Sequence, residues 1–186
     1  MNRFRVVALV LVSLGGPVSA SVDPVQNPPD QLPEYVIKAG FLFNFAKYVE
    51  WPGASFEGPE SPITIGIVGA DPFGDNLEKS LSHKTVNKRP FVIRRYAAPS
   101  DLGRCHILFV SRSEKARTSE IIKQVEGQPV LTVGEDGAFA ASGGMIAILI
   151  ENEKPRLEVN PEAAETAKLT INSKLLKLAT IVKTVK

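Results

Sequence analysis

The sequence contains little cysteine and little histidine, with one Cys and two His among its 186 residues. A single cysteine cannot form a disulfide within the chain. Transition metals are held by converging Cys, His and carboxylate side chains, and the sequence offers few candidates, so we predict no metal site. Cys105 opens the apolar run 105–110, which also holds His106, and we interpret this cysteine as a buried, unreactive side chain.

The sequence also lacks an excess of charge of one sign. It has 22 Lys and Arg against 20 Asp and Glu, and two of the basic residues, Arg3 and Arg5, lie within residues 1–20. Without those first residues the chain carries 20 charges of each sign, and no block of like charges remains. Proteins that bind nucleic acid or a polar membrane surface usually show a basic patch or stripe. The sequence therefore predicts no nucleic-acid partner.

The first 33 residues are predicted to lie outside the folded domain. Residues 1–20 combine a basic start, the apolar run 6–14 and small residues before Ala20, which is typical of a secretory signal peptide cleaved after Ala20. The apolar run is too short for the ~20 residues that span a bilayer. Residues 21–33 hold four prolines and are predicted to be a proline-rich tether. We therefore expect an exported chain whose domain covers residues 34–186.

Within residues 34–186 the pattern alternates between helices and strands. Continuous apolar strands favour burial on both faces, as in a parallel sheet, and the last two strands are predicted to form a hairpin. We predict a single α/β domain of three layers, with a mostly parallel sheet of about six strands flanked by helices and a C-terminal edge hairpin. The predicted helices cover 34–51, 71–82 and 114–126, with two more starting at Pro161 and after Ser173, and the predicted strands cover 63–68, 91–96, 105–110, 130–133, 145–150 and 156–159.

Motifs that would mark an enzyme are missing from the sequence. No GxxxxGK[ST] run is present, and Gly66, Gly69 and Gly74 do not have the GxGxxG spacing. Ser111 and Ser142 lie in no G-x-S-x-G motif. We therefore predict no catalytic residues and no cofactor, and we interpret the protein as a binding or regulatory protein and not an enzyme.

One loop could bind a small anion. Gly69, Asp71 and Gly74 follow a predicted strand and open a predicted helix, and the start of a helix at the carboxyl edge of a sheet can receive an anion. A simpler interpretation is that Asp71 and Asp75 stabilise the first turn of that helix. Both interpretations remain open at this point.

The first predicted helix carries an aromatic stripe. Phe41, Phe45 and Tyr48 recur at i, i+4 and i+7, and Trp51 lies near the helix end. Such a stripe most often belongs to the core. The opposite side of the helix is apolar as well, however, so part of its surface could contact a protein partner or an apolar ligand.

Several blocks of the sequence resemble a known family. The run from Tyr35 to Pro52 is similar to the opening helix of the YfiR/HmsC family, also called the DUF4154 family. Further blocks agree in the same order, and together the resemblance covers residues 34–182. These blocks are 65–69 with 72–74, 105–111, 130–133, Phe139 with 143–146, and 159–179.

The resemblance implies a compact α/β domain in the periplasm that has no catalytic residues and needs no cofactor. It also implies a repressor that acts on the periplasmic sensor region of an inner-membrane diguanylate cyclase and lowers cyclic di-GMP and biofilm output. An outer-membrane lipoprotein can draw such repressors away, and homodimers are common among the relatives. The main alternative is a periplasmic sensor that binds an apolar or anionic small molecule at the carboxyl edge of the sheet.

One departure from the family concerns redox regulation. Relatives with redox-sensitive stability carry paired cysteines, one of which matches Cys105, whereas this chain has no second cysteine. An intramolecular disulfide switch is therefore excluded.

Overall fold

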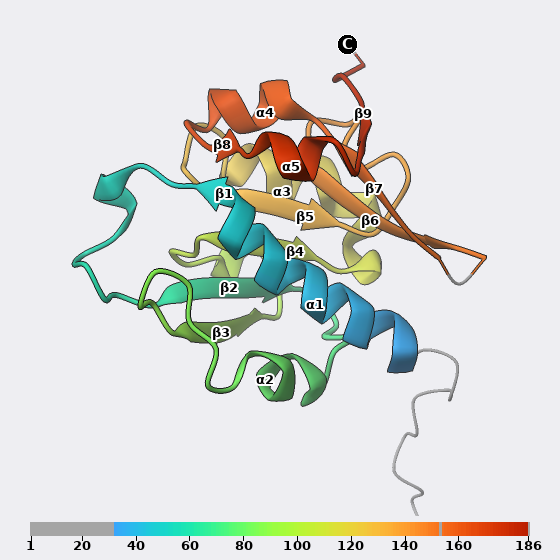
Figure 1. Cartoon of the computed structure of the whole chain (residues 1–186). Coiled ribbons are helices and arrows are strands. Elements are labelled where there is room, and N and C mark those ends of the chain that lie inside the picture. The colour runs from blue at the N-terminus through green and yellow to red at the C-terminus, as the bar shows by residue number, and fades with distance from the viewer. Residues whose placement is uncertain (1–31, 153, 186) are drawn as a thin grey trace, which may run out of the picture.

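The computed structural model describes residues 32–152 and 154–185 (Figure 1). The predicted signal peptide with Ala20, and the tether up to residue 31, lie outside the described residues. Helix α1 spans Leu32–Tyr48 and is followed by strand β1, Val49–Glu50. Helix α1 therefore begins two residues before the predicted helix 34–51 and ends three residues before its predicted end. Trp51 precedes Pro52, which disfavours the helical conformation, and Val49 and Glu50 instead form strand pairs with residues 170–171.

A seven-stranded sheet forms the centre of the domain, in the order β3-β2-β4-β5-β6-β7-β9. Neighbouring strands are parallel except for the β6–β7 hairpin, so the predicted mostly parallel sheet is confirmed. A separate antiparallel pair joins β1 to β8, Thr170–Ile171. The strands of the large sheet are β2 Ile63–Val68, β3 Phe91–Tyr96, β4 Ile107–Val110, β5 Leu131–Gly134, β6 Ile146–Glu151, β7 Lys154–Val159 and β9 Thr180–Ile181.

The C-terminal end of the chain differs from the prediction. The helix predicted after Ser173 is α5, Ser173–Leu176, which has only four residues, and the chain then continues to β9. Leu178 lies beyond α5 and is 77% exposed. Strand β9 pairs in parallel with β7, and Val182 N–H donates to the Val159 carbonyl at 2.9 Å. The predicted hairpin is present, and β9 forms the outermost strand beside it.

Helices cover both faces of the sheet. Figure 1 shows α1 crossing one face and α3 behind the sheet, which confirms the three-layer arrangement. Alternate residues of the strands face the two sides: Ile65 and Ile107 belong to the core cluster on the α1 side, and Leu108 joins Ile121 of α3 on the other. The remaining helical segments are α2 Asn76–Leu81, α3 Thr118–Gln124 and α4 Pro161–Thr166, with 3₁₀ turns η1 Gly53–Ser55, η2 Pro99–Asp101 and η3 Arg112–Arg117.

Two helix starts lie one or two residues from where the sequence suggested. The helical segment predicted at 114–126 begins with η3 at Arg112; Ser111 precedes it with an extended backbone, and its hydroxyl accepts from Ser113 N–H at 3.4 Å. Asn172, and not Ser173, caps α5 by accepting from Lys174 N–H at 2.9 Å. A capping residue needs a backbone outside the helical region, and only the preceding residue has it in each case. Asn160 caps α4 as the Asn160–Pro161 pair indicated.

Candidate functional site

The carboxyl ends of β2, β4 and β5 meet at one edge of the sheet. Strand β2 lies between β3, which follows it in the chain, and β4. The connection after β2 passes through α2 on the α1 side, and the connection after β4 passes through α3 on the opposite face. In open α/β sheets, ligands usually bind where connections diverge in this way. This edge is therefore the first place to look for a site.

The crevice between β2 and β4 is filled by protein atoms. Gly69 has φ +90°, and a Cβ at this position would collide with Ser113 Oγ and with the Glu114 side chain. Ala70 N–H donates to Ser113 Oγ at 2.9 Å, and Ser113 Oγ in turn lies 3.4 Å from Ser111 Oγ. Glycine is needed here because the chain approaches η3 closely in a left-handed conformation. The two serine hydroxyls thus hold the loops together.

The predicted anion loop contacts a cation that is already paired. Asp71 accepts from Phe73 N–H at 2.8 Å and from Arg95 Nε at 2.6 Å. Arg95 also contacts Glu78 at 2.7 Å and the Gly74 carbonyl at 3.3 Å. Arg95 lowers the pKa of Glu78 by donating to its carboxylate. Gly69, Asp71 and Gly74 are therefore close to a guanidinium, but two carboxylates of the protein occupy it, and an anion site at this loop stays a prediction.

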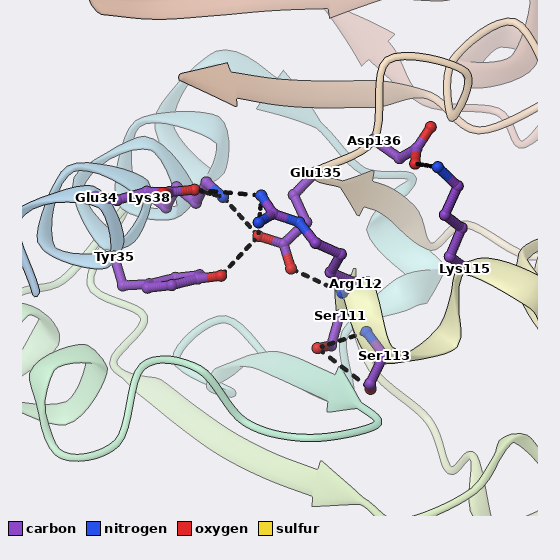
Figure 2. A network of polar contacts seen from close by, with 9 residues as sticks. All are labelled: Glu34, Tyr35, Lys38, Ser111, Arg112, Ser113, Lys115, Glu135 and Asp136. Atoms are coloured by element: carbon purple, nitrogen blue, oxygen red, sulfur yellow. Dashed lines mark hydrogen bonds and ion pairs between the residues drawn. The ribbon is translucent and has the colours of Figure 1, made fainter. Parts of the chain in front are cut away.

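A buried polar network joins α1 to the carboxyl ends of β4 and β5 (Figure 2). The Lys38 side chain is fully buried; it contacts Glu135 at 2.5 Å and also pairs with Glu34, one helical turn before it. Glu135 accepts from the Tyr35 hydroxyl at 3.1 Å and from Arg112 N–H at 2.7 Å. Burial, and then the charge of Glu135, raises the pKa of Tyr35 above its usual value.

The charges in this network balance one another. Two carboxylates, Glu34 and Glu135, lie beside Lys38, and the Arg112 guanidinium is 3.5 Å from Glu34 and 3.8 Å from Glu135. Buried charges are tolerated when they are paired and hydrogen-bonded, and removing one partner is strongly destabilising. The network therefore fixes the start of α1 against the sheet and offers no free charge. No local pattern in the sequence indicates this network.

The aromatic stripe of α1 lies mostly in the core. Phe45 is fully buried, and Phe41, Tyr48 and Trp51 are half-buried against the same core cluster. Trp51 Nε1 donates to the His106 carbonyl at 3.2 Å, which fixes the chain after the helix. Phe45 cannot contact a partner in this structure. A contact through the exposed parts of the other three residues stays a prediction.

The amino edge of the sheet is organised around His106. Its Nδ1 accepts from Thr64 N–H at 3.0 Å, so Nε2 carries the proton and donates to the Ser55 carbonyl at 3.1 Å. The ring stacks on Phe56 with centroids 4.5 Å apart. Burial lowers the pKa of His106, and the nearby Arg89 and Arg104 lower it further. His106 is thus a neutral residue that positions the loop 52–57 beside an open cleft.

Cys105 is buried beside this cleft, as the sequence predicted. Burial raises the pKa of its thiol to about 12. The thiolate is the reactive form of cysteine, so Cys105 is unreactive at neutral pH.

The loop before β6 contains two adjacent glycines. Gly143 has φ +96°, and Gly144 allows the Phe139 ring to pack directly on the backbone. The Gly143–Gly144 pair therefore serves chain packing in this structure.

Metal-binding clusters and membrane-spanning helices are both absent from the part of the chain that the structure describes. Across 32–152 and 154–185, no three His, Cys, Asp or Glu side chains are grouped in a way that would hold a metal ion. In the same part of the chain, no helix has the length and apolar character needed to cross a bilayer.

The family model described as YfiR/HmsC-like matches residues 35–180, which include every strand of the large sheet except the last residue of β9.

Proposed function

Because the chain belongs to the YfiR/HmsC-like family, we propose that it is a periplasmic regulatory protein that represses an inner-membrane diguanylate cyclase. In this proposal the domain binds the periplasmic sensor region of the cyclase and thereby lowers cyclic di-GMP and biofilm output. The observation that carries the proposal is the family match over residues 35–180. The signal-peptide pattern of residues 1–20 supports export.

Repression of this kind is a shift between conformations of the cyclase. The regulator lowers output only to the extent that it binds the inactive conformation more tightly than the active one. A tenfold preference for the inactive conformation corresponds to about 1.4 kcal/mol. It limits the change in the ratio of inactive to active cyclase to tenfold. A lipoprotein of the outer membrane would relieve repression by competing for the regulator, so the partner-binding surface must be accessible.

The direct test is deletion of the gene in cells that express the cognate cyclase. We expect cyclic di-GMP and biofilm to rise, and the full gene supplied in trans to restore the low level. A matched control supplies the same gene without codons 2–20, which should fail to restore it because the product stays in the cytoplasm. Unchanged cyclic di-GMP after deletion would contradict repression, and full rescue by the leaderless gene would contradict a periplasmic site of action.

A second candidate function is a periplasmic sensor that binds a small molecule. One observation favours it: the structure has an open cleft of about 720 Å³ at the amino edge of the sheet. The two functions are compatible, since a ligand that binds one state of a regulator more tightly changes its affinity for a partner. Thermal-shift measurements with small molecules test the sensor function without reference to the cyclase.

A further inference from the structure

The cleft at the amino edge has the size of a small-ligand site. Its volume of about 720 Å³ exceeds the pockets of about 330 and 130 Å³ beside α2 and α4. Sites for small molecules typically measure about 300–1,000 Å³. The loop 52–57 forms one wall, the segment 104–106 before β4 forms the floor, and the turn 127–130 forms a second wall.

Three cations from different parts of the chain line this cleft. Arg94 comes from β3, Arg104 precedes β4, and Lys168 follows α4. Across residues 32–152 and 154–185, none of the three pairs with a carboxylate. One acidic residue, Glu57, lines the same cleft. Excess positive charge in a concave site attracts anions.

The segment that lines the cleft also contains a buried hydroxyl. The Ser55 hydroxyl is buried and has no hydrogen-bond partner among the described residues. Buried polar groups nearly always have a partner, so an orphan hydroxyl requires an explanation. An oxygen of a bound ligand would supply that partner if the Ser55 side chain turned toward the cleft. His106 cannot do so, because both of its ring nitrogens are already engaged.

The wall that carries Ser55 is held in place before any ligand binds. His106 Nε2 donates to the Ser55 carbonyl, and its ring stacks on Phe56. The Arg89 guanidinium covers the Phe56 ring at 3.7 Å and donates to the Gly58 carbonyl at 2.7 Å. A prearranged site loses little conformational freedom on binding. Apolar surface for the body of a ligand comes from Pro52, Pro62, Pro129 and Val130.

We propose that the amino-edge cleft binds a small organic anion, whose phosphate or carboxylate group is held by Arg94, Arg104 and Lys168 and whose body lies against the prolines. The Ser55 hydroxyl donates to the same anionic group. The inference does not depend on the proposed regulation of a cyclase, because it rests on the cleft, its unpaired cations and its orphan hydroxyl.

The test measures binding of three probes to the purified chain by calorimetry and thermal shift, in a buffer without phosphate or carboxylates. Phenyl phosphate and benzoate share an apolar ring and differ in the anionic group, and benzyl alcohol is the neutral control. We expect at least one anion to raise the melting temperature and to bind at least tenfold more tightly than benzyl alcohol. Preference for phenyl phosphate identifies a phosphate site, and preference for benzoate identifies a carboxylate site.

Matched variants separate a built site from general charge attraction. Arg94→Gln with Arg104→Gln removes two cleft cations, and Arg95→Gln with Lys115→Gln removes two cations near the other edge. We expect the first pair to weaken binding at least tenfold and the second pair to leave it within twofold. Lys168→Asn provides an independent single variant, since asparagine tolerates the φ of +60° at this position.

Two results would overturn the proposal. One is binding of both anions no tighter than that of benzyl alcohol, and the other is an equal loss of binding in both double variants.

Discussion

At the carboxyl edge of the sheet, charged side chains contact one another, whereas at the amino edge three cations face an open cleft. Both edges are built from the ends of the same parallel strands. The difference arises because α1 brings Glu34 and Lys38 to the carboxyl edge, where Glu135 meets them. In an α/β sheet the carboxyl edge is the usual place for a ligand, but here its polar groups are already satisfied. Position in the fold alone therefore does not identify a free ligand site in this domain.

The largest expected effect comes from breaking the carboxyl-edge network. Glu135→Ala leaves the buried ammonium of Lys38 with Glu34 as its remaining carboxylate. We expect the free energy of unfolding to fall by about 3–5 kcal/mol, because the buried Lys38 keeps only one carboxylate and the Tyr35 hydroxyl and Arg112 N–H lose their acceptor. Chemical denaturation measures the loss.

The matched control for this change is Lys115→Ala. Lys115 is exposed and pairs at 2.7 Å with Asp136, the residue next to Glu135. An exposed pair contributes about 0–1 kcal/mol. Equal losses in the two variants would show that the carboxyl-edge network is no more than a set of surface pairs, and the contrast between the edges would disappear.

A smaller effect on stability is expected from protonation of His106 at the amino edge. The folded protein lowers the pKa of His106 below its usual value, mainly by burial and also through Arg89 and Arg104. The unfolded chain then binds more protons below the usual histidine pKa of about 6.5, so stability present above that pH is lost as the pH falls. We expect His106→Asn to lose less stability than the unmodified chain between pH 7.5 and 5.

The control for the pH experiment is His83→Asn, because His83 is exposed and has a φ of +60°, which asparagine tolerates. This variant should keep the pH dependence of the unmodified chain. A pH dependence that is the same in all three proteins would contradict the lowered pKa of His106.

The smallest effect is expected at the exposed ion pairs of the carboxyl edge. Arg95→Ala removes contacts to Asp71 and Glu78, and Arg95 is substantially exposed. We expect a loss of about 1 kcal/mol or less, reduced further in 1 M salt. The pKa of Glu78 should rise toward its usual value, which NMR titration of the carboxyl group measures. A loss as large as that of Glu135→Ala would contradict the distinction between buried and exposed pairs.

Features that depend on local sequence could be predicted, and contacts between distant segments could not. The continuous apolar runs 63–68 and 105–110 predicted buried parallel strands because both faces of the sheet are covered. Lys38 and Glu135, in contrast, are 97 positions apart, and from the sequence Lys38 resembles an ordinary surface partner of Glu34 one turn away. No spacing rule connects the two, so the network was missed.

The candidate sites show the same division. Gly69, Asp71 and Gly74 follow one another in the chain and were singled out, yet the cation beside them, Arg95, belongs to β3. The cleft at the other edge is made by Arg94, Arg104 and Lys168, which lie in three separate parts of the chain. His106 also lies at that edge, but its place in the apolar run 105–110 gave no indication of the cleft.

The pairing of β1 with β8 bears on the order in which the domain folds. Val49 is aligned with Ile171, and Asn172 N–H donates to the Tyr48 carbonyl at 2.8 Å, so the end of α1 is completed by residues that come more than a hundred positions later. Contacts of such long range form slowly, because a large loop must close first. The end of α1 can therefore become fixed only after residues 170–172 have been added to the growing chain, whereas the rest of the helix can pack earlier on α2.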